Sequence, residues 1–438
     1  MTEGRPLVRK TALATGATLL GYVATIVQQL VYARALGVGS DVDALAAALA
    51  WSLAITGFVG TTFASAVVPA YLRLRAAGDA GAGDLFRSTN TVALLIGLAL
   101  SAGSFAFAPA VAPVLLPGAS GATLATLSDL LRLTAPMQLL WIAVITGTAL
   151  ANAQGRYVAA AAITILPSLA VLVSILAYPS VTGAGMGYVL GYAIELAVLL
   201  IMLRESWHSD LLPERPAAVG PLVRPILFIG FALLLINGSG VAIRAIASLG
   251  GPGDLAVFDY ASRLSLAAEA ILSTSALAVV FTVWSEDSSR ERHRLPLART
   301  LAVAAALSSV AAAAVAALAP IVVGLLFQGG RFGAADTARV SLVLALLAPG
   351  MAGRIVHMMA LRALLAWHGT WSMAVVGVTA LAGVIGGGLL GQAIAGLGGA
   401  ALGYSCAWIC VAVVTAVAAI SVSRGHGPSR LGDNHDPR

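Results

Sequence analysis

Residues 249–286, LGGPGDLAVFDYASRLSLAAEAILSTSALAVVFTVWSE, decide how the whole chain is interpreted. They restate residues 36–69, LGVGSDVDALAAALAWSLAITGFVGTTFASAVVP, and they add an arginine within an apolar helix. The spacing between matching residues stays between 211 and 214 along more than a hundred residues. The matching pairs are Leu36 and Leu249, Gly37 and Gly250, Asp41 and Asp254, Val67 and Val279, Val68 and Val280, Pro109 and Pro320, Pro136 and Pro349, and Gly155 and Gly369. This pattern predicts two copies of one structural unit.

The composition is that of a membrane protein. Hydrophobic residues make up 59% of the 438 residues, charged residues only 10%, and the mean hydropathy is +0.94. No soluble core of this length requires so many apolar residues. The net charge of +6 lies in short loops instead of a patch with interleaved aromatic residues, so nucleic acid is not an expected partner. Cys406 and Cys410 lie four residues apart in an apolar segment, where we expect packing and neither a disulfide nor a metal site.

Apolar windows long enough to cross a bilayer occur twelve times, six in each half of the chain. Because each half holds an even number of spans, both copies enter the membrane in the same direction. The predicted fold is an all-α membrane protein with twelve transmembrane helices, arranged as two six-helix parallel repeats around a central cavity. The expected windows are residues 11–34, 43–72, 90–116, 126–152, 157–178 and 181–203, then 221–248, 254–284, 297–327, 336–366, 371–392 and 396–422.

The basic residues predict the orientation. The two ends of the chain and the even-numbered loops hold 18 of the 25 arginine and lysine residues, and the odd-numbered loops hold 3. Since positive loops stay in the cytoplasm, both termini are expected there. The expected domains are an N-terminal bundle at residues 1–203, a cytoplasmic linker at 204–220, a C-terminal bundle at 221–422 and a cytoplasmic tail at 423–438.

No enzyme motif is present. The chain has no HExxH, no phosphate-binding Walker loop and no GxSxG, so we expect no catalytic residues, no cofactor and no enzymatic activity. Function therefore rests on polar residues at membrane depth, which are costly there. Arg244, Arg263 and Arg354 would together cost about 8 to 10 kcal/mol if they faced lipid. They are expected to face the protein interior or water.

The second half holds most of the candidate site. Residues 237–240, NGSG, form helix poorly and could free backbone groups toward a cavity, with Asn237 and Arg244 on one face. Asp259 and Arg263 are four residues apart and can form a structural ion pair or hold a substrate. His357 follows Arg354 within one turn and is either a packing residue or part of the site.

The first half offers milder groups. Gln28 and Gln29 are the candidate site residues there, while Gln138, Asn152 and Glu195 are other polar residues within spans. For most of them interhelical hydrogen bonding is the favoured role. A cleft with cations mainly from the second half suits an anionic head group, above all a phosphate.

The chain resembles the MurJ (MviN) lipid II flippase family of the MOP exporter superfamily. The resemblance rests on YARALGVGSDVDAL at 32–45, SAVVP at 65–69, FDYASRL at 258–264 and LLFQGGRFGAADT at 325–337. It implies two six-helix bundles around a cavity that opens alternately to each side. It also implies that cavity arginines hold the diphosphate of a lipid-linked sugar, and it assigns Arg263 and Arg244 to that role.

Several family positions differ in this chain. Gln28 and Gln29 replace an arginine-aspartate pair, and Ile243 replaces the aspartate that precedes Arg244. Span 11 lacks the asparagine and aspartate of the family's sodium site, so no metal site is expected.

The resulting hypothesis is a monomeric transporter in the cytoplasmic membrane, surrounded by membrane lipids, that flips a polyprenyl diphosphate sugar by alternating access. Its substrate-binding residues are expected to be Arg244, Arg263, Arg354, His357, Asn237, Asp259, Gln28 and Gln29. One alternative is an exporter of a drug, secondary metabolite or polysaccharide unit from the same superfamily. Another is a membrane scaffold that does not transport.

Overall fold

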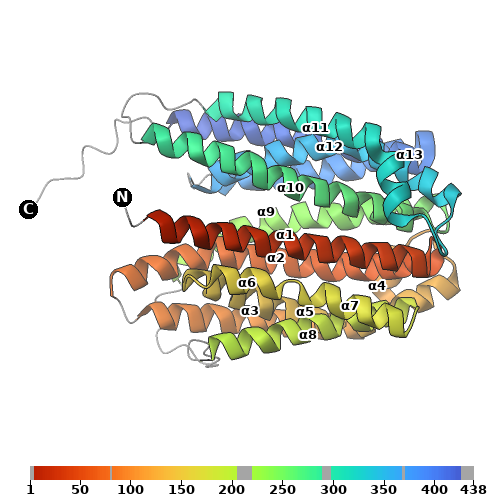
Figure 1. Cartoon of the computed structure of the whole chain (residues 1–438), viewed down its shortest axis with the longest axis horizontal. Coiled ribbons are helices and arrows are strands. Elements are labelled where there is room, and N and C mark those ends of the chain that lie inside the picture. The colour runs from red at the N-terminus through yellow and green to blue at the C-terminus, as the bar shows by residue number, and fades with distance from the viewer. Residues whose placement is uncertain (1–3, 79–80, 205–219, 289–296, 367–369, 426–438) are drawn as a thin grey trace, which may run out of the picture. The chain divides into compact units, whose positions relative to one another are not determined.

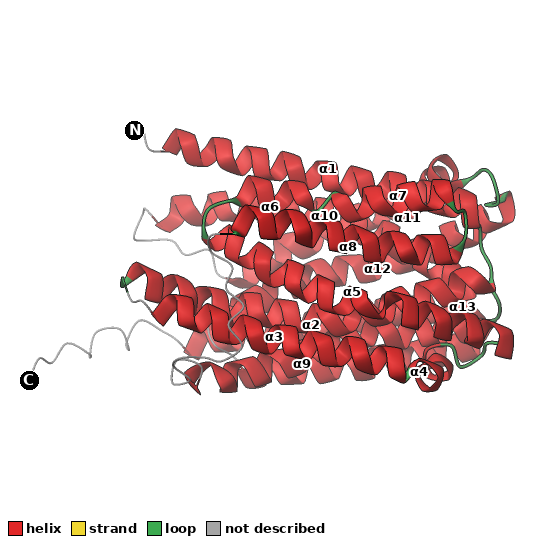
Figure 2. Cartoon of the chain, turned by 90° about the horizontal axis from the view of Figure 1, so that it is seen from below, coloured by secondary structure: helices red, strands yellow, loops and turns green. Residues whose placement is uncertain are grey.

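The computed structural model describes residues 4–78, 81–204, 220–288, 297–366 and 370–425 (Figure 1). In these ranges the chain is helical, and no strand forms beyond one isolated bridge between Gly329 and Phe332 (Figure 2). The all-α prediction is therefore confirmed for the described residues. Most of the expected linker at 204–220 and of the expected tail at 423–438 lies outside these ranges.

The helices follow the apolar windows of the sequence. In the first half they are α1 (Gly4–Leu36), α2 (Ser40–Ala76), α3 (Gly81–Ala106), α4 (Ala108–Leu115), α5 (Gly121–Ala153), α6 (Tyr157–Ile163), α7 (Leu166–Ala177) and α8 (Val181–Leu203). In the second half they are α9 (Gly220–Ala247), the short 3-10 helix η2 (Ser248–Gly250), α10 (Asp254–Ser288), α11 (Leu297–Phe327), α12 (Ala334–Ala366) and α13 (Thr370–Gly425).

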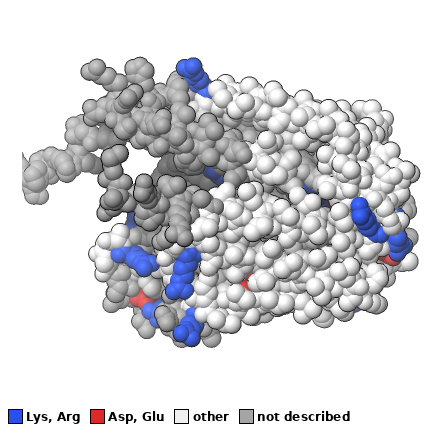
Figure 3. All heavy atoms as spheres, in the orientation of Figure 1, with Lys and Arg blue, Asp and Glu red and all other residues white. Residues whose placement is uncertain are grey.

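Ten helices in the described ranges are long and apolar enough to cross a membrane. The chain is therefore a multi-pass membrane protein. One of the ten, α13, contains two residues with non-helical dihedral angles, Ala395 and Gly396. On the face in Figure 3, arginine and lysine side chains gather toward the ends of the helices, and the surface between them is mostly uncharged. This distribution suits an apolar bilayer between two polar interfaces.

Proline breaks two of the expected spans into shorter helices. α4 begins just before Pro109, and α7 begins just before Pro167, so each proline lies in the first turn of a new helix. Proline is tolerated there because its missing N–H would have no partner within the helix. Pro349, by contrast, lies inside the continuous helix α12.

The chain divides into two compact units. The first comprises residues 1–257 and 323–338, and the second comprises residues 258–322 and 339–438. The first unit has a core with Phe63, Phe86, Ile142 and Leu199. α9 packs against α2 within this unit, although the repeats would assign α9 to the second bundle. The expected boundary at 204–220, between the two predicted repeats, stays a prediction, because the compact units divide after residue 257 instead.

Glycines allow close packing in one helix pair of each unit. In the first unit, a Cβ atom at Gly187 or Gly191 of α8 would lie 2.6 or 2.5 Å from the backbone of α7. In the second unit, a Cβ atom at Gly399 or Gly403 would lie 2.0 Å from a backbone oxygen of the first half of α13. Small residues let membrane helices approach this closely. In both halves, glycines therefore let the last two helices pack closely against each other.

Candidate functional site

Asp259 and Arg263 form an ion pair on α10. Nε of Arg263 donates a hydrogen bond to Oδ2 of Asp259 at 2.6 Å. Only 8% of the Asp259 side chain and 19% of the Arg263 side chain is exposed. The four-residue spacing places both side chains on one helix face, so the predicted pairing is confirmed. The role of either residue in binding a substrate stays a prediction.

Arg354 of α12 is held by two other helices of the second unit. Its Nη2 donates to Oε2 of Glu269 on α10, and its Nη1 donates to the hydroxyl of Tyr404 on α13 at 3.0 Å. The guanidinium carbon also lies 5.8 Å from the ring centre of Trp408. Sequence reasoning singled out Arg354 but missed Glu269. The signal was available, because Glu269 is a carboxylate within an apolar helix.

His357 lies one turn beyond Arg354 and is buried. Its Nδ1 is 2.9 Å from the hydroxyl of Thr415, and its ring centre lies 5.3 Å from that of Trp408. The hydroxyl of Thr415 donates to the carbonyl oxygen of Val411. These contacts satisfy the imidazole within the unit, as expected for a packing residue. A direct role for His357 in binding stays a prediction.

α9 is continuous through residues 237–240, so the expected unwinding of this segment is wrong. Nδ2 of Asn237 donates to the carbonyl oxygen of Leu233 at 2.8 Å, and Nη1 of Arg244 donates to that of Gly240 at 3.0 Å. Both side chains thus bond to their own helix. In an apolar surrounding a helix keeps every backbone group paired, which outweighs the low helix propensity of glycine.

The two glutamines of α1 differ in their surroundings. Nε2 of Gln28 donates to the hydroxyl of Tyr188 on α8 at 2.8 Å, which confirms interhelical hydrogen bonding for this residue. Gln29 is also buried, but its Oε1 has no hydrogen-bond partner in the described part of the chain. A buried carbonyl oxygen without a partner is uncommon. A substrate-binding role for Gln29 stays a prediction.

Two hydrogen bonds join the start of α2 to the start of α10 within the first unit. The buried carboxylate of Asp43 accepts hydrogen bonds from the backbone N–H groups of Gly253, at 2.6 Å, and Ala256, at 2.7 Å. Gly253 directly precedes α10 and Ala256 lies in its first turn, where N–H groups have no partner within the helix. The carboxylate also complements the positive end of the helix dipole. Sequence reasoning singled out the neighbouring Asp41, which is exposed, and missed Asp43.

Two of the motifs that carry the resemblance, at residues 32–45 and 325–337, contact each other beside these hydrogen bonds. The N–H of Arg331 donates to the carbonyl oxygen of Arg34 at 2.9 Å. Gly330 and Gly37 have positive φ angles of 58° and 71°, and a Cβ atom on either would lie under 3.0 Å from the backbone of the other loop. Only glycine fits at both positions. We refer to Asp43, Gly253, Ala256, Arg34 and Arg331 together as the loop clasp.

The candidate residues therefore fall into separate groups. Asn237, Arg244, Gln28 and Gln29 belong to the first unit, whereas Asp259, Arg263, Arg354 and His357 belong to the second. In the second unit both arginines are paired with carboxylates, which sequence reasoning foresaw for Arg263 alone. The expected excess of cations from the second half is thus largely neutralised by its own acidic residues.

The model of the family "Lipid II flippase MurJ" matches residues 9–427. The chain belongs to the MurJ family. The resemblance that the sequence motifs indicated is thereby confirmed. The curated proteins include no relative that matches the chain's sequence.

Solved structures of the MOP superfamily share the fold with this MurJ family member. A lipid II flippase MurJ in an inward closed conformation matches with a TM-score of 0.73 and 17% identity, over 94% of this chain and 87% of that one. An inward-facing MATE multidrug transporter also has a TM-score of 0.73, with 15% identity over 95% and 99% of the two chains. A MOP transporter from Pyrococcus furiosus has a TM-score of 0.60 and 14% identity, over 94% and 96%.

Proposed function

We propose that this protein is a flippase, and not an enzyme, that moves a lipid-linked diphosphate precursor of the lipid II type across the cytoplasmic membrane. The observation that carries the proposal is the MurJ family match over residues 9–427. Charged residues kept inside apolar helices support it, because such residues usually serve a transport path. The head group crosses through the protein while the lipid tail stays in the bilayer.

Arg244 and Arg263 bind the diphosphate in this proposal. A guanidinium offers two parallel hydrogen bonds to a phosphate, which a point charge cannot match. Asp259 holds Arg263 through Nε and thereby fixes the direction of its guanidinium. Arg354 and His357 support the site from α12, and Asn237, Gln28 and Gln29 add polar groups from α9 and α1.

Alternating access requires one end of the protein to open when the other closes. The loop clasp supports such a mechanism, because it ties α2 to the first turn of α10 with two short bonds from one carboxylate. We propose that these bonds break when the substrate leaves on the far side of the membrane.

We further propose twelve spans, with both termini in the cytoplasm. α13 is long enough for two spans separated at Gly396, and α10 adds another to the ten candidate helices. The matched glycine packing of α7 with α8 and of the two halves of α13 supports two parallel repeats. A cysteine introduced at Ser120 should react with an impermeant thiol reagent from outside, and one at Ser288 should not. The reverse pattern would contradict this topology.

The partners in this proposal are the lipid-linked anion and the surrounding membrane lipids, and the protein acts as a monomer. Nucleic acid is not a partner, and neither a cofactor nor a metal ion is required.

A second candidate function is export of an amphipathic drug or secondary metabolite. It is favoured by the MATE transporter, whose TM-score equals that of the MurJ structure and 99% of whose chain is covered. The pairing of Arg263 and Arg354 with carboxylates also leaves less net positive charge for a diphosphate. A scaffold without transport remains the third candidate.

Rescue of bacterial cells depleted of their lipid II flippase tests the main proposal. We expect the wild-type chain to restore growth and Arg244→Ala to fail at equal expression. Arg132→Ala is the control, because it also removes one arginine, but Arg132 forms an exposed ion pair with Asp129 and is not a candidate site residue. Drug efflux without rescue would favour the exporter. Neither activity in a correctly inserted protein would favour the scaffold.

A further inference from the structure

A hollow lies at one end of the first unit, apart from the residues assigned to transport. It has a volume of about 490 Å³ and is lined by α2, α3 and the turn between α5 and α6. Three arginines line it, Arg75, Arg87 and Arg156. The 18 to 3 distribution of basic residues predicts that this end faces the cytoplasm. We call this hollow the arginine pocket.

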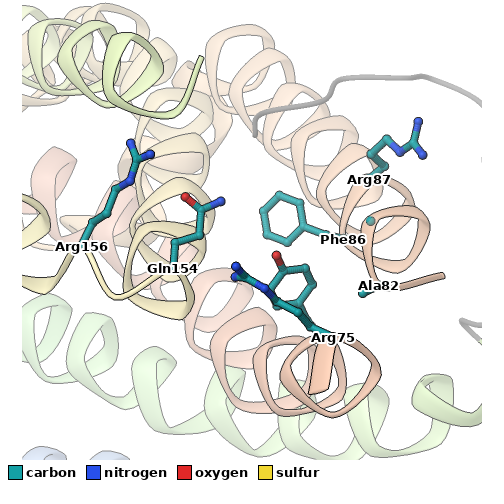
Figure 4. Close-up of a pocket in the computed structure, with 8 residues that line it drawn as sticks. Arg75, Ala82, Phe86, Arg87, Gln154 and Arg156 are labelled. Carbon is teal, nitrogen blue, oxygen red and sulfur yellow. The ribbon is translucent and has the colours of Figure 1, made fainter. Parts of the chain in front are cut away.

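The three arginines that line the pocket come from three separate elements. Figure 4 shows Arg156 and Gln154 on one side and Phe86 and Arg87 on the other, with the guanidinium of Arg75 extending between them. Arg87 pairs with Asp84, and Nη1 of Arg156 donates to the carbonyl oxygen of Met202. Against these three cations the described residues place one carboxylate at the pocket, so positive charge prevails.

The side chain of Arg75 has no hydrogen-bond or ion-pair partner within the described ranges. The same holds for the amide of Gln154. Arginine carries five N–H donors in a planar fork that matches the oxygens of a phosphate. Arg75 therefore presents this fork to the pocket together with the donor group of Gln154.

The start of α3 supplies a second feature that favours an anion. Ala82 and Gly83, in the first turn of this 26-residue helix, line the pocket. The first N–H groups of a helix have no partner within it, and the helix dipole places positive potential there. A Cβ atom at Gly83 would meet nothing within 4 Å, so there is open space beside its Cα atom.

Aromatic packing fixes the shape of the pocket. The ring of Phe86 lies edge-on to Tyr71, with centres 5.9 Å apart, and to Phe63, with centres 5.7 Å apart. Phe63 and Phe86 belong to the core of the first unit. A pocket wall that is anchored in the core is organised before a ligand arrives, which lowers the entropic cost of binding.

From these features we propose that the arginine pocket binds a phosphate-bearing anion. This goes beyond the proposed function, because none of the pocket residues is assigned to the transported head group. The phosphate can belong to an anionic lipid head group or to a soluble phosphate compound. Both present the same oxygens to Arg75, Arg156 and the start of α3.

The full-length purified protein tests the proposal and separates the two sources. One arm measures pyrophosphate binding by isothermal titration calorimetry in a neutral detergent. The other arm uses native mass spectrometry to measure retention of phosphatidylglycerol, with phosphatidylcholine as the competing lipid. Pyrophosphate binding that Arg75→Gln weakens assigns a soluble ligand to the pocket, whereas binding that only Arg244→Ala weakens belongs to the transport site. Selective retention of phosphatidylglycerol without such pyrophosphate binding assigns a lipid head group.

Matched variants decide whether the pocket is responsible. Arg75→Gln and Arg156→Gln should each weaken binding about tenfold or more, the effect of losing one charge-assisted hydrogen bond. Arg73→Gln removes the same charge from the same helix end, because Arg73 is exposed like Arg75 but does not line the pocket. It should change binding less than twofold.

Gly83→Leu provides a test that leaves the charge unchanged, since it fills the pocket at an open position. It should weaken binding as much as Arg75→Gln. Equal losses in Arg73→Gln and Arg75→Gln would overturn the proposal in favour of general surface charge. Absence of both pyrophosphate binding and selective lipid retention in the wild type would overturn it as well.

Discussion

Removal of Glu269 should destabilise the protein far more than removal of an exposed acid. Only 8% of the Glu269 side chain and 12% of the Arg354 side chain is exposed, so solvent screens the pair weakly. Glu269→Leu leaves a guanidinium that keeps Tyr404 and the face of Trp408 but has no counter-charge. Breaking such a pair costs about 3 to 5 kcal/mol, and a lone charge at membrane depth costs about 2.5 to 3.5 kcal/mol.

The comparison pair is Asp129 and Arg132 on α5. Its atoms are 3.7 Å apart, and 80% and 42% of the two side chains is exposed. Because exposed pairs contribute little, Asp129→Ala should leave stability nearly unchanged. The difference of about 3 kcal/mol corresponds to a ratio of about 100 or more between the unfolding equilibrium constants of the two variants.

The assay is thermal unfolding of detergent-purified protein, read as the monodisperse fraction in size-exclusion chromatography after heating. Glu269→Leu and Arg354→Met should each lower the midpoint by several degrees, and the double variant should recover most of the loss because no charge remains unpaired. Single variants as stable as Asp129→Ala, or a double variant worse than both, would refute the assigned pairing.

Three further predictions follow from the other contacts. Asp43→Ala removes two hydrogen bonds from the start of α10 and should expose a cysteine placed at the buried Ala256 to thiol reagents faster than in the parent; unchanged labelling would contradict the loop clasp. Arg263→Ala strands Asp259 and should lower stability, but it should also abolish transport when equal amounts of folded protein are compared; rescue of transport by adding Asp259→Ala would instead assign a structural pair. Gly403→Val places a methyl group against a backbone oxygen and should sharply lower the yield of folded protein, whereas Gly386→Val, at an open position, should not.

Helix positions could be predicted closely from hydropathy. The windows expected at 181–203 and 297–327 coincide with α8 and α11. Long apolar runs leave few alternatives in a membrane, because a crossing segment must satisfy its backbone internally. The same constraint explains the error at residues 237–240, where glycine propensities measured in water suggested a break that the membrane helix does not make.

Partners between distant helices could not be predicted. The pairing of Asp259 with Arg263 follows from helical periodicity within one helix, and the sequence was sufficient for it. Glu269 and Arg354 lie 85 residues apart, and no periodicity relates them. Asp41 and Asp43 are both near the start of α2, and only their packing distinguishes the exposed one from the one that caps α10.

The two paired arginines have a consequence for a transporter of anions. A cation that bound its substrate without any other partner would be left bare in the membrane at each release, at a cost of about 2.5 to 3.5 kcal/mol. Such a site would hold its cargo rather than deliver it. Asp259 lies beside Arg263 and provides the counter-charge that the guanidinium needs after a substrate has left. The carboxylate lowers the affinity for a diphosphate, and it lowers the barrier to release by the same interaction. Under the proposed function, the pair therefore lowers the affinity for the substrate and raises the rate of its release.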